Sequence, residues 1–245
     1  MTSLARSFVL DLNEREQFDR NGFLVLAQFF TAEKCDAIAS ELGGVLEQQQ
    51  AVSTRARGGL RGVFRSSPLA AEIAGDSRLI SLLRDLMGGQ VRPVRGIFFD
   101  KNAAVNWSVP WHQDLAIAVA EKIEITGFGP WSVKDDVVHV QPPTHILAEM
   151  ITVRLHLDDC SADNGALQVI PGSHQHGELS ADEIAKWTAR EEAVVCEVPK
   201  GGALLMRPLL LHASSRVAEP SHRRVLHIEY AAKALPNGLR WFEQS

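Results

Sequence analysis

The sequence is poor in cysteine, has no long apolar run and carries no excess of positive charge. Its three cysteines (Cys35, Cys160 and Cys196) are odd in number and widely spaced, so we expect reduced thiols in a cytoplasmic protein. No apolar run approaches the roughly 20 residues that cross a bilayer. The apolar stretch before Asp11 is also too short for the core of a signal peptide. The net charge of -5 argues against broad nucleic-acid binding, which needs Lys and Arg to neutralise phosphates. We therefore expect neither a membrane nor a nucleic-acid partner.

The length and composition are those of one ordinary globular domain. The chain has 245 residues, of which 45% are hydrophobic and 22% are charged. β-Barrel folds often reach this length without dividing, and we find no internal repeat, linker or low-complexity tract. We therefore expect a single domain over residues 1–245, with a helical part over roughly 1–90 and a barrel over roughly 91–235.

The first ninety residues carry signals for helices. Thr31 is a suitable N-cap for a helix that runs to about Glu47. Asp76 can cap a second helix, which the two glycines at 88–89 would end. Between these helices, the segment 53–67 holds several arginines among glycines and predicts a loop.

From residue 91 onward the sequence changes to short β-rich segments separated by turns. A capping box of Ser180 and Glu183 predicts one helix among them. Helices followed by many short strands favour a helix-buttressed β-barrel or jelly roll. The segment 115–149 is long and rich in Gly, Pro and aromatic residues, as functional lids often are. The expected strands are Val94–Lys101, Met150–Leu157, Ala166–Ile170, Ala193–Val198, Ala203–Met206 and Arg224–Ala231.

The sharpest local motif is Trp111-His112-Gln113-Asp114. In an extended strand, side chains at i and i+2 point to the same face, so His112 and Asp114 can both reach one ion. His212, at the end of an apolar strand, is the best candidate for a third ligand. Two histidines and one carboxylate on one face of an octahedral ion leave three open positions, which is the arrangement of non-haem Fe(II) oxygenases.

Taken alone, each part of this motif also has a structural interpretation. H-x-D arises often by chance, and the chain has nine histidines, so one of them downstream proves nothing. His174 and His176 flank a turn and are expected to be structural or solvent-facing. His222 and His227 are expected to pack in the core or lie at the surface.

Several motifs follow one another in an order that resembles a known family. They are FDRNGFLVLAQFFTAEKCDAIASEL near the N-terminus, His112-Gln-Asp114, NGALQVIPGSH from Asn164, His212-Ala-Ser214 and Arg223. Together they resemble the phytanoyl-CoA dioxygenase (PhyH) family of Fe(II)- and 2-oxoglutarate-dependent oxygenases. The resemblance covers nearly the whole chain.

This resemblance implies a mainly β fold with flanking helices, namely a double-stranded β-helix (a cupin-like jelly roll). It implies Fe(II) at one mouth of the barrel, bound by His112, Asp114 and His212. Arg223 matches the arginine that holds the distal carboxylate of 2-oxoglutarate, and Ser214 matches a hydrogen-bonding partner of the same cosubstrate. Arg154 occupies a position where another cosubstrate contact is expected, although its residue type differs.

The implied reaction is hydroxylation of a small molecule, with O2 as oxidant and release of succinate and CO2. The presence of Asp114 favours hydroxylation, because related halogenases leave that position small so that halide can bind the iron. The family name is not evidence for a CoA thioester, because members act on many small molecules.

Three segments are candidates for the wall of a substrate pocket. Phe128 and Trp131 of the segment 115–149 would close over an apolar substrate, or else belong to a packed surface loop. The arginines of residues 55–65 would pair with an anionic substrate group, or else be solvated. The third group lies close in sequence to His112 and would line the pocket or pack beneath it: Lys101, Trp107 and Trp111.

Two other functions remain open from the sequence. One is a cupin-like metal dioxygenase that needs no 2-oxoglutarate, which would tolerate the loss of Arg223. The other is a binding module in which the metal is structural, so that metal removal would unfold the chain.

Overall fold

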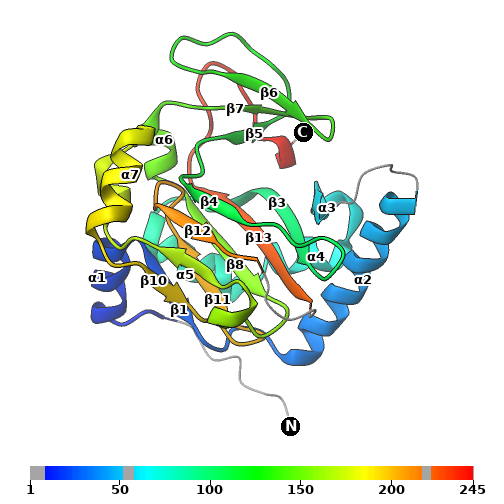
Figure 1. The fold of residues 1–245 in the computed structure, drawn as a ribbon. Coiled ribbons are helices and arrows are strands. Elements are labelled where there is room, and N and C mark those ends of the chain that lie inside the picture. Colours follow the sequence, from blue (N-terminus) through cyan, green and yellow to red (C-terminus); the bar gives the residue numbers. More distant parts are fainter. Residues whose placement is uncertain (1–8, 52–57, 217–221, 245) are drawn as a thin grey trace.

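The structure is a computed structural model that describes residues 9–51, 58–216 and 222–244 (Figure 1). Its strands are β1 (Phe23–Leu26), β2 (Gly59–Arg61), β3 (Arg92–Lys101), β4 (Val109–His112), β5 (Ile117–Val119), β6 (Trp131–Lys134), β7 (Val137–Val140), β8 (Ile151–His156), β9 (Leu167–Val169), β10 (Val194–Cys196), β11 (Ala203–Met206), β12 (His212–Ser214) and β13 (Arg223–Ala231). Its helices are α1 (Leu12–Asn21), α2 (Ala32–Ala51), α3 (Val63–Ser66), α4 (Pro68–Ala74), α5 (Ser77–Met87), α6 (Thr144–Ala148) and α7 (Ala181–Arg190), with short 3-10 turns at Ala162–Asn164, Ser173–His176 and Phe242–Gln244.

Two antiparallel sheets form the barrel. The larger sheet has the strand order β1-β11-β8-β13-β3-β2, and the smaller one has the order β10-β9-β12-β4. Neighbouring strands are mostly far apart in the sequence, which is the crossover pattern of a jelly roll. The expected double-stranded β-helix is confirmed.

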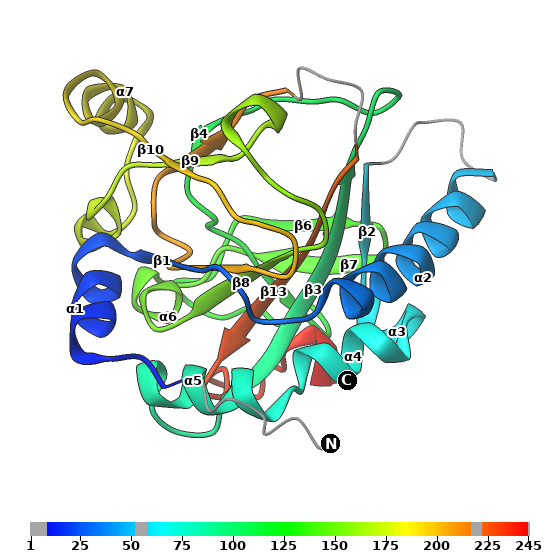
Figure 2. The same cartoon turned by 90° about the horizontal axis from the view of Figure 1, so that it is seen from below.

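The helices of the first ninety residues pack on the outer face of the larger sheet, and the smaller sheet lies on the other side (Figure 2). On β8, Ile151, Val153 and Leu155 join the apolar cluster formed with these helices. Thr152, Arg154 and His156 alternate with them, and all three are buried. The larger sheet is therefore apolar toward the helices and unusually polar toward the barrel interior.

Most predicted elements are present, with ends shifted by a few residues. Asp76 caps α5 by accepting hydrogen bonds from the backbone N–H groups of Arg78 and Leu79. Every predicted strand forms, and Ser180 and Glu183 form the predicted capping box of α7. Among the described ranges, no helix combines the length and apolar character needed to cross a bilayer.

Two segments differ from the sequence prediction. The expected loop over 53–67 contains β2 and α3 in its described part, whereas Arg55 and Arg57 lie outside the described residues. Arg61 at the end of β2 forms an ion pair with Asp135 at 2.6 Å. The division into helices and barrel is also less sharp than expected, because β1 and β2 form the two edges of the larger sheet.

The segment 115–149 is a folded unit rather than an irregular lid. It contains α6 and a third antiparallel sheet of order β5-β7-β6, which projects from the barrel beside the C-terminal residues (Figure 1). Ile117, Val119 and Val140 of this sheet pack with Leu239 and Trp241 in one apolar cluster. Phe128 and Trp131 pack against the same cluster, which supports the packed-surface interpretation of these two residues.

Candidate metal centre

The three predicted ligands are brought together by strand pairing at one end of the smaller sheet. His112 ends β4 and His212 begins β12, and the two are direct partners in the antiparallel register. Asp114 follows β4, where its backbone N–H donates to the carbonyl of Pro208 at 2.9 Å. One ligand atom from each of the three side chains lies within 4.8 Å of the others.

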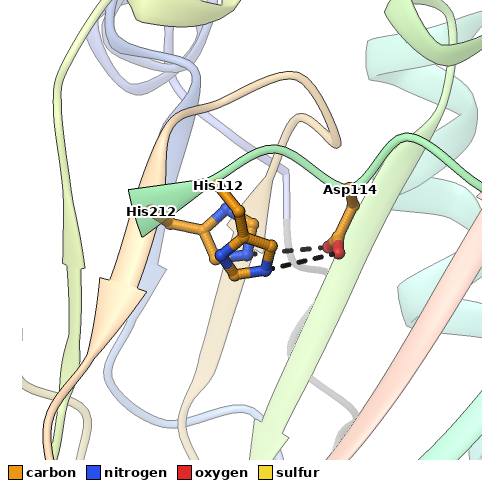
Figure 3. Close-up of side chains that lie close together, drawn as sticks. All are labelled: His112, Asp114 and His212. Atoms are coloured by element: carbon orange, nitrogen blue, oxygen red, sulfur yellow. Dashed lines mark ion pairs between the residues drawn. The ribbon is translucent and has the colours of Figure 1, made fainter. Parts of the chain in front are cut away.

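Both imidazole rings direct Nε2 toward the carboxylate of Asp114 (Figure 3). His112 Nε2 lies 3.9 Å from Asp114 Oδ1, and His212 Nε2 lies 3.7 Å from Asp114 Oδ2. The Nδ1 atoms donate to backbone carbonyls, His112 to Pro110 at 2.9 Å and His212 to Leu210 at 2.8 Å. This second hydrogen bond fixes the tautomer that leaves the Nε2 lone pair free for a metal ion.

The electrostatics of the three groups also suit a cation. Burial lowers the pKa of His212 to about 4, so that its ring is neutral at physiological pH. Burial alone would raise the pKa of Asp114, but His212, His227, His112 and Arg95 outweigh it and lower this pKa. The site therefore offers the neutral imidazole of His212, the carboxylate of Asp114 and Nε2 of His112, a donor set that fits a divalent ion with three open positions.

Gln113, between two of these ligands, anchors the motif from the opposite side. Its amide nitrogen donates to the carbonyls of Gly177 at 2.8 Å and Leu209 at 2.7 Å, and its amide oxygen accepts from the N–H of Leu179 at 2.8 Å. This side chain is buried. Gln113 therefore ties the end of β4 to two loops and holds His112 and Asp114 in place. No motif in the sequence predicts this role for Gln113.

A cavity of about 220 Å³ opens beside the three ligands. At one end of it, Lys101 on β3 is the direct strand partner of Arg223 on β13. Lys101 Nζ donates to Ser214 Oγ at 2.9 Å and to the Ser215 carbonyl at 2.9 Å. Arg223 donates through Nη1 to the Gly165 carbonyl at 2.8 Å, while its Nε is buried without a partner among the described residues. Lys101, Ser214 and Arg223 therefore form one polar group, the distal group.

Lys101 carries an unusual charge state because of this environment. Burial, followed by the nearby guanidinium groups of Arg223 and Arg154, lowers the pKa of its amine to about 7. An anion placed against the distal group would restore the charge of this amine. The sequence analysis considered Lys101 only for its closeness to the ligand motif, and strand pairing now places it opposite Arg223.

A second polar group lies further along the same inner face. Arg154 on β8 is the direct strand partner of His227 on β13, and Arg154 Nη1 donates to His227 Nδ1 at 3.0 Å. Both residues line the cavity. His227 is buried and its ring packs edge-on against Phe99, which fits the packing expected from sequence. Its place in the cavity wall adds to that expectation. Period-two alternation from Arg223 would have placed it on the inner face.

The remaining sequence candidates lie as follows. Arg223 is 2% exposed and faces the cavity, whereas Arg224 points away and binds Asp158 at 2.6 Å. Trp107 lines the cavity, but Trp111 packs against the apolar cluster beneath α7. Three other histidines bind away from the cavity: His174 to the Asp19 carbonyl, His176 against the ring of Trp187, and His222 to Asp100.

Comparison with known proteins identifies the family. The family described as Phytanoyl-CoA dioxygenase (PhyH) matches residues 18–225 of this chain. The chain belongs to this phytanoyl-CoA dioxygenase family. The match covers both histidines of the candidate metal centre, its aspartate and Arg223.

Curated relatives of this PhyH-family chain include a dioxygenase and a hydroxylase. Ectoine dioxygenase of Stutzerimonas stutzeri (strain A1501) is 25% identical over 171 residues, which is 66% of this chain and 49% of the relative. L-proline trans-4-hydroxylase of Streptomyces griseoviridis is 23% identical over 250 residues, covering 89% of this chain and 85% of the relative. The chain thus spans about half the length of the ectoine dioxygenase that it matches.

Solved structures share the fold of this PhyH-family chain. EctD from S. alaskensis, solved with 2-oxoglutarate and 5-hydroxyectoine, matches with a TM-score of 0.72 and 20% identity over 94% of this chain and 79% of that one. SnoK, described as a non-heme alpha ketoglutarate dependent carbocyclase from nogalamycin biosynthesis, matches with a TM-score of 0.70 and 13% identity over 94% and 87% of the two chains.

Proposed function

We propose that this protein is an Fe(II)- and 2-oxoglutarate-dependent dioxygenase that hydroxylates a small molecule. The observation that carries the proposal is the convergence of His112, Asp114 and His212 beside a cavity whose distal group is cationic. A purely structural metal site is normally closed by four protein ligands and has no use for open positions. Membership of the family and the likeness to hydroxylating relatives support the same proposal.

His112, Asp114 and His212 would hold Fe(II), and the distal group would hold the far carboxylate of 2-oxoglutarate. A guanidinium and an ammonium provide charge-assisted hydrogen bonds to that carboxylate, and the Ser214 hydroxyl adds a neutral one. With O2, bound Fe(II) and 2-oxoglutarate would supply an oxidative decarboxylation in which one oxygen atom would enter succinate, CO2 would leave, and the other oxygen atom would enter a C–H bond of the substrate. The protein's part is to orient the reactants and keep the cavity dry.

The buried, unpartnered polar atoms support this use of the cavity. The Nε atoms of Arg223 and Arg154 are buried without a partner among the described residues. Such atoms are costly in an empty protein and are commonly satisfied by a ligand or ordered water. A cytoplasmic location, expected from the three cysteines, is proposed with this function.

The test is anaerobic addition of Fe(II) and 2-oxoglutarate, followed by visible absorption. The expected result is the charge-transfer band of chelated cosubstrate in wild type, its loss in His212→Ala, and its retention in His176→Ala, a histidine outside the cavity. Absence of the band in folded, iron-loaded wild type would refute the proposal and favour a dioxygenase without cosubstrate or a binding module. Circular dichroism of metal-free protein separates these two, because only the module should unfold.

A further inference from the structure

The cavity beside the metal centre holds more positive charge than its proposed occupants neutralise. Lys101, Arg154 and Arg223 line it, and among the described residues that line it Asp114 is the one carboxylate. The three cationic side chains are 0%, 7% and 2% exposed. Within the described ranges, none of them has a carboxylate partner within 4.0 Å among the ion pairs of the structure.

The formal charge of the loaded cavity follows directly. Three cations and Asp114 give +3 − 1 = +2. Fe(II) adds two positive charges and 2-oxoglutarate adds two negative ones, so the sum stays at +2. Burying unpaired charge is expensive, and the proposed function therefore leaves the cavity with a demand for a further anion.

Strand register separates the cations into two groups. Arg223 is paired with Lys101, and the distal group that they form with Ser214 is taken by the far carboxylate of the cosubstrate. Arg154 is paired with His227, four residues further along β13 on the same face. The far carboxylate of the cosubstrate therefore does not neutralise the charge of Arg154.

The partner of Arg154 orients it without neutralising it. Arg154 Nη1 donates to His227 Nδ1, so the lone pair of His227 is used on that nitrogen. His227 Nε2 then donates to Glu229 at 3.3 Å, and burial lowers the pKa of His227, which keeps its ring neutral. The charge of Glu229 is already matched by its ion pair with Arg95.

The free edge of the guanidinium has the form of a carboxylate receptor. In the described part of the chain, His227 is the hydrogen-bond partner of Arg154, and the Nε–Nη2 edge has none. That planar edge accepts a carboxylate through two parallel hydrogen bonds. The ring of Phe99 lies 5.9 Å from the centre of the guanidinium, and Phe99 also lines the cavity. An acidic group at Arg154 would thus lie beside an apolar wall.

We infer that the substrate of this enzyme is a small carboxylate, and that Arg154, oriented by His227, binds its acidic group. The inference rests on the proposed function and names its substrate class. Arg154 is then a specificity-determining residue rather than the cosubstrate contact that its position suggested from sequence.

The test measures binding rather than turnover. Anaerobic protein loaded with Fe(II) and 2-oxoglutarate is titrated with straight-chain acids from acetate to octanoate, each against its amide, and the perturbation of the visible band reports binding. We expect at least one acid to bind about tenfold or more tightly than its amide, equivalent to about 1.4 kcal/mol. Arg154→Gln should abolish this preference, whereas Arg154→Lys should keep part of it.

Arg207→Gln is the matched control, because Arg207 is a partly buried arginine outside this cavity. It should leave both the preference and the cosubstrate affinity unchanged, and circular dichroism checks the folding of each variant. Should Arg154→Gln not fold, Arg154→Lys alone decides, through a changed acid-to-amide ratio.

Three outcomes would overturn the inference. If no acid binds better than its amide, the cavity does not select carboxylates. If Arg154→Gln weakens the binding of 2-oxoglutarate as strongly as Arg223→Gln does, Arg154 binds the cosubstrate and not the substrate. If methylphosphonate binds more tightly than every acid, the carboxylate class is wrong. Absence of the band in wild type is a different failure, because it refutes the proposed function itself.

Discussion

Binding of 2-oxoglutarate is expected to take up a proton above pH 7, and Lys101 is the group that should accept it. Burial and two neighbouring arginines lower the pKa of this amine to about 7. At pH 8, about one-tenth of the empty protein would therefore carry a charged Lys101. A carboxylate bound at the distal group favours the charged form and raises this pKa again.

The magnitude follows from these two states. If the bound amine is fully charged at pH 8, each binding event takes up about 0.9 proton. The affinity for 2-oxoglutarate should then fall nearly tenfold for each pH unit above about 7.5, until the pKa of the bound form is reached. Below pH 6.5 the amine is mostly charged in both states, and the affinity should change little.

Isothermal titration calorimetry checks this expectation. The iron-loaded protein is titrated anaerobically at pH 8 in two buffers of different ionisation enthalpy, and the difference in observed heat gives the number of protons taken up. Lys101→Met should bind more weakly, with an uptake close to zero and with affinity nearly independent of pH. Zero uptake in wild type, or the same uptake in the variant, would refute the assignment of Lys101 to the cosubstrate.

Three further predictions concern neighbouring residues. Arg223→Gln should weaken the binding of 2-oxoglutarate by about 100-fold, because a buried charge pair loses one partner at a cost of about 2–5 kcal/mol. Arg224→Gln should change this affinity less than about threefold. Equal effects of the two substitutions in titrations of the visible band would contradict the orientation of the two side chains. Gln113→Leu removes the partner of three backbone groups, two buried and one partly buried, and should lower the free energy of unfolding by roughly 3–6 kcal/mol. Urea denaturation measures this, with the exposed Gln175→Leu as control, and a loss below about 1 kcal/mol would show that the anchor is dispensable. Burial raises the pKa of Cys35 to about 11 and that of Cys196 to about 12, and it also raises the pKa of Cys160. A disulfide reagent should therefore label no thiol in native protein and all three in urea. Rapid labelling of native protein would contradict the burial of these thiols.

The barrel could be predicted from sequence because its signals are local and repeated. Alternation marks β13 and β8, turn dipeptides separate the strands, and the ligand motif falls at a strand end. The metal triad could be predicted because the i, i+2 spacing of His112 and Asp114 at the end of β4 and the order of the family's motifs supply its three members. In these parts, local preference and tertiary structure agree.

The rest depends on contacts that no local pattern encodes. β2 has three residues and forms through its pairing with β3. The arginine- and glycine-rich sequence around it predicts a loop instead. The sheet of β5, β6 and β7 is stabilised by packing against Leu239 and Trp241, which lie about 100 residues or more later in the sequence. The role of His227 likewise follows from which residue of β8 lies opposite it. These features depend on which residues of different strands lie opposite one another, and a local sequence pattern does not show that.

The place of β13 in the larger sheet has a consequence for how the protein is made. β13 is the last of the strands in the described residues, yet it lies in the interior of the sheet, between β8 and β3. During synthesis, β8 and β3 must wait with unpaired edges until Ala231 leaves the ribosome, and such non-local pairing is slow to form. Because β13 also carries Arg223 and His227, the nascent chain cannot assemble the cavity before its sheet is complete. The proposed oxidative chemistry would therefore need a chain that extends at least to the end of β13.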